Sequence, residues 1–187
     1  MNMQDEYLKF RKTSEKLICR TPVFDVKVQH EVAHTGFEGD YISVSAPHWL
    51  VVIPAIDGKF VMVRQWRHAM ERITVEFPGG VGEAGEEPEI AAARELEEET
   101  GYHADKITHL GTVSPNPALF SNRLHIYLAE ELTQTGILNP DEDEILEVME
   151  LPIEEVLNNF GSLEYTHAFT GTAIALYLKH LRNRDAV

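Results

Sequence analysis

The sequence contains a single cysteine, Cys19, among its 187 residues. One cysteine cannot form a disulfide within the chain, so a disulfide-stabilised secreted scaffold is excluded and a reducing compartment is expected. Long apolar stretches are missing too. The nearest one, residues 48–56, falls well short of the roughly 20 residues that a membrane helix needs, and Pro54 interrupts it. Because the first residues also lack the pattern of a signal peptide, we expect a soluble, cytoplasmic protein without a membrane partner.

Basic residues are scarce. The chain has 16 Lys and Arg against 31 Asp and Glu, which gives a formal net charge of −15. Such a surface would repel the phosphates of a duplex nucleic acid, so we expect no nucleic-acid partner. A polyphosphate substrate would meet the same repulsion unless divalent cations were bound in the site. Bound cations reverse the potential locally while the outer surface stays acidic.

What the sequence does contain is a glycine-rich loop that leads into a helix. Pro88 suits the first helical turn, where its missing N–H costs nothing, and Gly101 suits the left-handed position just after the end. At about 100° per residue, Glu95, Glu98 and Glu99 fall at steps i, i+3 and i+4. The three carboxylates therefore share one arc of this predicted helix.

Two interpretations of this acidic arc are open, a solvated face and a cation site. Helices that carry Glu for solubility usually place Lys four residues away, because like charges at that spacing repel each other. From Glu95 to Lys106 there is no basic residue. Carboxylate oxygens are hard ligands that select Mg²⁺ or Mn²⁺. We therefore favour a site for one of these two ions.

The loop and helix together form a longer pattern. Gly80 is followed after five residues by Glu86, and after seven more by the run Arg94-Glu95-Leu96-x-Glu98-Glu99-x-Gly101-Tyr102. This pattern resembles the Nudix box with every defining position filled, and it is far more specific than a lone glycine motif. The resemblance implies divalent-metal hydrolysis of a nucleoside diphosphate linked to another group.

The resemblance also implies roles for residues in and beside the box. Glu95, Glu98 and Glu99 would ligate the metal ions, and the backbone carbonyl of Gly79 would be a further ligand. Glu98 and Glu99 are taken as catalytic residues. Arg94 is counted with them, because it lies one turn before Glu98 and can pair with it.

The general base is left open at this point. In the ADP-ribose pyrophosphatase subfamily, which this chain resembles, the base can come from an acidic loop beyond the box, and residues 141–144 form such a cluster here. Within it we prefer Glu142, with Glu144 second. Two alternatives remain: the cluster is a solvated turn, or the base lies in the box itself, with Glu98 the first suspect.

Candidate substrate contacts lie outside the box. Arg67 is the first choice for a phosphate contact and Arg64 the second, because a guanidinium matches phosphate oxygens; the alternative is surface arginines that end a strand. Glu76 is a candidate for a supporting or sugar-side group. Pro117 lies fifteen residues after Tyr102, about where a proline marks ADP-ribose hydrolases within the family. Its surroundings depart from the Ser-Pro-Gly form of the commonest members, so the sugar of the substrate stays open.

Large aromatic and histidine side chains are assigned to the structure rather than to the site. Trp49, Trp66 and Phe24 are taken as core residues in preference to platforms for base stacking. His125 and His167 are taken as structural histidines. The preferred base of the substrate is therefore left open as well.

Strand patterns dominate the rest of the chain. Asp57-Gly58 predicts a hairpin between strands at residues 50–53 and 60–63, and a final amphipathic helix is predicted from 166 to about 182. Strands with a few helices give an α+β class. The resemblance implies the Nudix fold, a mixed sheet between helices in an α/β/α sandwich.

We expect residues 46–187 to form the Nudix hydrolase domain, with residues 1–45 as an added strand region of the same unit. This region resembles the one that ADP-ribose pyrophosphatases add, and the resemblance implies a domain-swapped homodimer. Added strands need a partner to cover their edges.

The leading functional hypothesis is hydrolysis of ADP-ribose, or of a related nucleoside diphosphate sugar, to a nucleoside monophosphate and a sugar phosphate. Another Nudix substrate, such as GDP-mannose, a dinucleoside polyphosphate or a capped RNA end, is the alternative within the same chemistry. A Nudix module that senses a nucleotide without turnover is the alternative from a different class. Such a module should have lost box carboxylates, and this chain keeps them.

Overall fold

A computed structural model describes residues 3–83, 85–139, 144–184 and 186. The chain forms two compact units: Met1–Pro47 with Ser114–Arg123, and His48–Val113 with Leu124–Val187. The first unit thus includes residues 114–123, which the strand region expected from the sequence does not contain. Within the described residues, no helix has the length and apolar character needed to cross a membrane.

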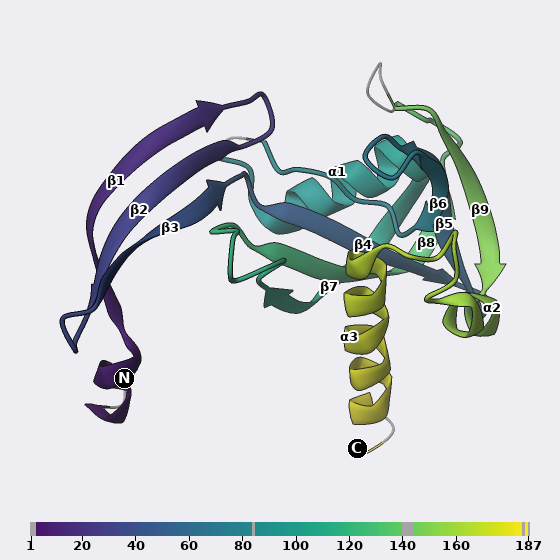
Figure 1. Cartoon of the computed structure of the whole chain (residues 1–187). Coiled ribbons are helices and arrows are strands. Elements are labelled where there is room, and N and C mark those ends of the chain that lie inside the picture. The colour runs from purple at the N-terminus through teal and green to yellow at the C-terminus, as the bar shows by residue number, and fades with distance from the viewer. Residues whose placement is uncertain (1–2, 84, 140–143, 185, 187) are drawn as a thin grey trace. The chain divides into compact units, whose positions relative to one another are not determined.

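The first unit is built on a three-stranded antiparallel sheet in the order β1-β2-β3 (Figure 1). Its elements are a 3-10 helix, η1 (Met3–Leu8), and the strands β1 (Phe10–Arg20), β2 (Asp25–Ala33) and β3 (Glu38–Ser45). The segment 114–123 joins β3 through a parallel bridge between Val44 and Phe120. Strand β1 was not predicted. All its residues are exposed, so burial imposes no alternation on its sequence.

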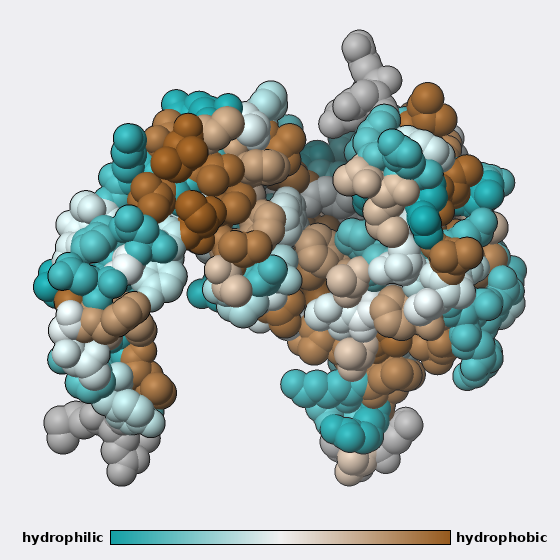
Figure 2. All heavy atoms as spheres, in the orientation of Figure 1, coloured by the Kyte–Doolittle hydropathy of each residue, from teal (hydrophilic) through white to brown (hydrophobic). Residues whose placement is uncertain are grey.

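The register of this sheet gathers apolar side chains on part of one face, which continues into His30, Asp40 and Glu38. Val28 lies opposite Ile42, and Val26 lies opposite Val44. Directly opposed residues point to the same face, so these four side chains form one apolar patch. In the part of the chain that the structure describes, this unit contains no α-helix and no second sheet. Figure 2 shows apolar side chains gathered on the surface of the unit.

The second unit holds a mixed sheet in the order β6-β5-β4-β8-β7, with β9 paired to β5 (Figure 1). Strands β4 and β8 run parallel, and the other pairs are antiparallel. Its strands are β4 (Trp49–Ile56), β5 (Lys59–Arg67), β6 (Arg72–Glu76), β7 (Tyr102–Val113), β8 (Leu124–Gln134) and β9 (Leu146–Pro152). Its helices are α1 (Pro88–Thr100), α2 (Ile153–Asn159) and α3 (Ala168–Arg184).

The turn between β4 and β5 confirms the predicted hairpin. Asp57 and Gly58 have φ of 49° and 75°, the left-handed values of a two-residue turn whose twist matches that of the strands. Pairing between the two strands is confined to the residues next to this turn. Beyond it, β4 pairs with β8, while β5 pairs with β6 and β9. The hairpin therefore opens, and β4 also contacts the glycine-rich loop, since the Leu50 N–H donates to the carbonyl of Gly80 at 2.9 Å.

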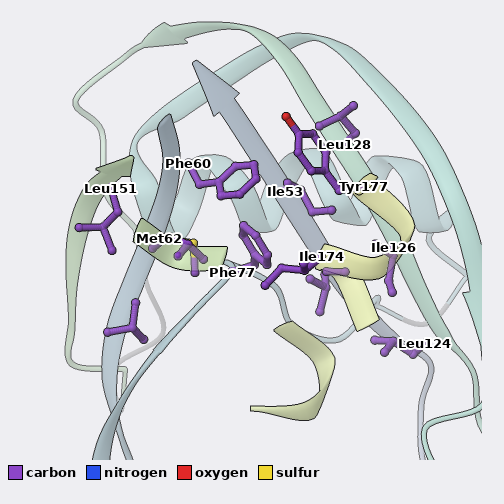
Figure 3. Close-up of a cluster of buried hydrophobic side chains, with 14 residues drawn as sticks. Ile53, Phe60, Met62, Phe77, Leu124, Ile126, Leu128, Leu151, Ile174 and Tyr177 are labelled. Carbon is purple, nitrogen blue, oxygen red and sulfur yellow. The ribbon is translucent and has the colours of Figure 1, made fainter. Parts of the chain in front are cut away.

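The core lies on both faces of β4. Leu50 and Val52 pack in a cluster with Leu96 of α1, whereas Val51 and Ile53 pack in a second cluster that includes residues of α2 and α3. Figure 3 shows the second cluster, in which the ring of Phe60 meets the rings of Phe77 and Tyr177 edge-on at centroid distances of 5.1 and 5.0 Å. Helices therefore cover the sheet on both faces, which confirms the predicted α+β fold with a mixed sheet between helices.

Candidate active site

Helix α1 forms between the residues that the sequence singled out. Pro88 occupies its first turn, and Gly101 follows its end in the left-handed conformation with φ 68°. The Gly101 N–H donates to the carbonyl of Glu97 at 2.9 Å and so satisfies one of the last carbonyls of the helix. Ala91, Ala92 and Leu96 are fully buried against the sheet. This packing fixes the rotation of the helix and therefore the direction of its carboxylate arc.

Arg94 joins the carboxylates of the loop and the helix. Its Nε and Nη2 donate to the two oxygens of Glu86 at 3.1 and 3.0 Å, and its Nη1 donates to Glu95 at 3.0 Å and to Glu98 at 2.8 Å. The predicted pairing of Arg94 with Glu98 is confirmed. Glu86 also accepts the Glu83 N–H at 2.9 Å, so Arg94 holds the glycine-rich loop through Glu86. The hydrogen bonds from Arg94 lower the pKa of the Glu86 carboxyl.

Glu99 is only 2% exposed. Its Oε2 accepts a hydrogen bond from the Gly79 N–H at 2.9 Å. Burial raises the pKa of the Glu99 carboxyl to about 8, although the bond from Gly79 acts in the opposite direction. Burial also raises the pKa of Glu95. Both carboxyls are thus poorly stabilised as anions by the protein alone, which is the condition that a bound cation relieves.

Two glycines allow the loop to pass close to its neighbours. At Gly79, φ is 156° and an added Cβ would collide with the carbonyl oxygen of Leu50. At Gly80, an added Cβ would lie 2.5 Å from Oε2 of Glu95. A side chain at Gly79 would have to displace backbone atoms, so this position requires glycine, whereas a side chain at Gly80 would displace the carboxylate of Glu95.

Arg67 and Glu76 form a bidentate ion pair at the ends of β5 and β6. The Arg67 Nε and Nη2 donate to the two Glu76 oxygens at 2.9 and 2.5 Å, and the Thr74 hydroxyl donates to Glu76 at 2.6 Å. Burial alone would raise the pKa of Glu76, but the bonds from Arg67 and its neighbours bring it below the ordinary value. The same pair raises the pKa of Arg67. Arg67 is therefore a firmly held cation near the glycine-rich loop.

Two hollows meet at Arg67. The smaller, of about 270 Å³, reaches Gly79 and Gly80. The larger, of about 650 Å³, is lined by the end of β5 and by residues 144–147. Arg67 and Glu144 line both hollows. These two side chains therefore mark the junction at which a ligand spanning both hollows would lie.

Other predicted residues have different surroundings in the structure. Arg64 pairs with Glu147 at 3.3 Å and lines the larger hollow. Pro117 is exposed and belongs to the first unit. The prediction that Trp66 is a core residue is wrong, because it is 49% exposed and lines the larger hollow. Phe24 is also exposed, so its assignment to the core is wrong too.

Three aromatic residues of the smaller hollow were not predicted as site residues, because Trp49 and His167 were assigned to the structure and Phe169 was not considered. Trp49, His167 and Phe169 all line it. They come from β4 and from the start of α3, far from the box in sequence, and no spacing connects them. The one available signal is that His167 lies at the start of the helix predicted from residue 166; in the structure, α3 begins at the next residue, Ala168.

The comparisons with known proteins agree with this geometry. The family model described as the NUDIX domain matches residues 45–169. The chain belongs to the NUDIX domain family. It is 38% identical to the ADP-ribose pyrophosphatase of Bacillus subtilis (strain 168), over 88% of this chain and 92% of that one. It is 27% identical to the ADP compounds hydrolase NudE of Escherichia coli (strain K12), over 74% of each chain.

A solved structure supports the Nudix fold independently. The crystal structure of an ADP compounds hydrolase superposes with a TM-score of 0.85 and 24% identity, over 96% of this chain and 97% of that chain. The identity is low, so the likeness establishes the fold only.

The Nudix carboxylates suit a divalent cation by their chemistry. Glu95, Glu98 and Glu99 offer hard oxygen donors on one helix face. In the described ranges, no three acidic or histidine side chains already converge closely enough to hold an ion. Glu95 and Glu98 are turned to Arg94, and Glu99 is turned to the Gly79 N–H. The burial of Glu95 and Glu99 is the structural observation that fits a cation.

The acidic loop is described in part. Glu142, the preferred general base, lies outside the described residues. Glu144 lies within them, and its negative charge contributes to the raised pKa of both Glu95 and Glu99. Such coupling requires Glu144 to lie near the two box carboxylates.

Proposed function

We propose that this Nudix protein hydrolyses ADP-ribose, or a related nucleoside diphosphate sugar, to a nucleoside monophosphate and a sugar phosphate. The observation that carries the proposal is the junction of two hollows at Arg67, beside the buried carboxylates of Glu95 and Glu99. A diphosphate with one group on either side matches such a site. The 38% identity to an ADP-ribose pyrophosphatase, over most of both chains, supports this substrate class.

The cofactor is proposed to be Mg²⁺ or Mn²⁺, held by Glu95, Glu98, Glu99 and the carbonyl of Gly79. When bound, a divalent cation neutralises diphosphate oxygens and lowers the pKa of a bound water. To bind the ion, Glu95 and Glu98 would turn away from Arg94, and Glu99 would turn away from the Gly79 N–H. Binding would also compensate the buried charge of Glu99, whose pKa is raised to about 8.

Arg67 is proposed to bind the diphosphate. Glu76 fixes the guanidinium plane through two hydrogen bonds, and the remaining N–H groups of Arg67 can donate to phosphate oxygens. Hydrolysis forms one P–O bond from water and breaks the bond between that phosphorus and the bridging oxygen. The bridging oxygen leaves with the other phosphate. A divalent cation held by the box carboxylates would supply positive charge that stabilises the charge developing on the leaving group.

The general base is proposed to lie in the acidic loop, at Glu142 or Glu144. Glu144 gains support because it lines both hollows and is electrostatically coupled to Glu95 and Glu99. Changing the general base to Gln should lower kcat strongly and leave KM nearly unchanged. Steady-state kinetics of Glu142→Gln and Glu144→Gln would decide between them. Near-normal kcat in both variants would place the base in the box, with Glu98 the first suspect.

The protein is also proposed to be a homodimer in which the first unit packs on a partner copy, in the domain-swapped manner. The support is the apolar face of its sheet, at Val26, Val28, Ile42 and Val44. A sheet with one apolar face is expected to bury that face against another layer, and a partner copy could supply it.

The proposed reaction can be tested with purified protein and a panel of nucleoside diphosphate derivatives. ADP-ribose should give AMP and ribose 5-phosphate by ion-exchange analysis, and the reaction should stop with EDTA and resume with added Mg²⁺. GDP-mannose and a dinucleoside polyphosphate serve as competing substrates in the same assay. Full turnover in metal-free buffer would contradict the metal-dependent mechanism. If no compound of the panel is hydrolysed, the protein is better explained as a nucleotide-sensing module.

A further inference from the structure

The smaller hollow has a wall that the proposed catalytic groups do not use. Phe169 lies between two other rings, with its centroid 5.3 Å from that of Trp49 and 4.7 Å from that of His167. The rings of His167 and Phe169 meet edge-to-face at 82°. Glu76, Arg67 and Glu144 also line this hollow. It therefore pairs an aromatic surface with polar groups.

His167 has hydrogen-bonding capacity left for a ligand. Its Nδ1 lies 3.7 Å from the nearer Glu76 oxygen, which is beyond hydrogen-bond distance. Glu76 is already bound by Arg67 and Thr74. Burial lowers the pKa of His167, so its imidazole is neutral near pH 7 and offers one donor and one acceptor. Its side chain is still 30% exposed.

The backbone holds His167 in place. The preceding segment is fixed to β6, since the Val75 N–H donates to the carbonyl of Glu164 at 2.8 Å. The turn before it is closed by the Gly161 N–H, which donates to the carbonyl of Tyr165 at 2.9 Å. Helix α3 begins at the next residue, Ala168. The imidazole is thus carried by an anchored segment, as a selective contact requires.

We propose that His167 is a specificity-determining residue that hydrogen-bonds a hydroxyl of the sugar half of the substrate, with Trp49 and Phe169 packed against the sugar ring. This inference rests on the proposed function. A sugar hydroxyl both donates and accepts, and a neutral imidazole complements it on both counts. The carboxylates near it can only accept, and Arg67 can only donate.

The size of the two hollows assigns the halves of the substrate. With the diphosphate at Arg67, one half enters about 270 Å³ and the other about 650 Å³. A nucleoside, with a base and a ribose, needs the larger space, which also offers the exposed ring of Trp66. A single sugar ring suits the smaller. His167 should accordingly contact the sugar and not the base of the substrate.

The test combines enzyme variants with substrate variants. Wild type, His167→Ala and His167→Gln are assayed with ADP-ribose, with IDP-ribose, and with an ADP ester in which an ethyl group replaces the sugar. Loss of one hydrogen bond should lower kcat/KM of His167→Ala about three- to tenfold for both ribose substrates. The ethyl ester should show no loss. His167→Gln, which keeps a donor and an acceptor, should recover part of the activity.

His103→Ala is the matched control, because His103 is exposed at the start of β7 and lines neither hollow. It should leave all three values unchanged. An equal loss on all three substrates in His167→Ala would overturn the sugar contact and make His167 a positioning residue for Glu76 and Arg67. An unchanged kcat/KM for all three would overturn it too. A wild-type enzyme that cleaves none of them would instead contradict the proposed function itself.

Discussion

The two units of this protein bury their strands in opposite ways. In the second unit, the four residues from Leu50 to Ile53 are at most 6% exposed, and they pack alternately into two clusters. In the first unit, every residue of β1 is exposed and every residue of β2 is only half-buried. A sheet covered on both faces has a core of its own, whereas a single layer with an apolar face is expected to bury that face against another element. We infer that the second unit supplies the chemistry and the first supplies the assembly.

The largest effect is expected when one carboxylate of the second unit is removed, which tests whether catalysis depends on this unit. Glu99→Gln should lower turnover on the order of a hundredfold or more, the scale on which single electrostatic groups in an active site act. The fold and the oligomeric state should not change, because Gln keeps the acceptor for the Gly79 N–H. Steady-state kinetics with ADP-ribose and sedimentation of the same sample would measure both properties. Near-normal turnover would mean that the cation sits elsewhere.

A substitution in the first unit tests the converse expectation, that the apolar face of its sheet holds the dimer together. Ile42→Asp places a charge on the apolar face of the sheet and should raise the dimer dissociation constant at least about tenfold, or ~1.4 kcal/mol. Tyr41→Asp is the matched control, since Tyr41 is the neighbouring residue on the opposite face and is similarly exposed, at 40% against 49%. Sedimentation over a range of concentrations would compare the two variants. Equal dissociation constants, or a monomeric wild type at micromolar concentration, would contradict assembly through the apolar face.

A further effect is expected on the pH dependence of stability. A carboxyl whose pKa is about 8 in the folded protein and 4.5 as its model value binds more protons when folded between these values. In metal-free buffer, Glu99 should therefore make the folded state less stable as pH rises from about 4.5 to 8.

Thermal unfolding with EDTA, followed across this pH range, would measure the effect. The Glu99→Gln variant should show a shallower fall in Tm, and Mg²⁺ should restore the wild type at the upper end. Parallel pH profiles for the two proteins would show that Glu99 is not the group responsible.

The local features of the site could be predicted because they depend on neighbouring residues in the chain. A proline in the first turn, a glycine after the last and carboxylates at i, i+3 and i+4 fix α1 and its acidic arc through helix geometry alone. The Arg94–Glu98 pair follows from the same spacing. The hairpin at Asp57-Gly58 is also a local feature, because its turn depends on two adjacent residues with positive φ.

Contacts between distant segments could not be predicted in this way. Strand β1 left no pattern, because with no buried side the side chains need not alternate. Trp66 was misassigned because a large aromatic residue is usually buried, and only the place of β5 at the rim of a hollow shows otherwise.

The sequence by itself determined the family, the α+β class, the loop and helix of the Nudix box and the carboxylates that line one face. These depend on spacing within about twenty residues, where backbone geometry is the main constraint. Only the tertiary structure decided that Arg67 is held by Glu76, that burial raises the pKa of Glu99, and that His167 meets Phe169 and Trp49 around one hollow. Burial and long-range contact arise when the sheet and helices pack, and no local spacing encodes them.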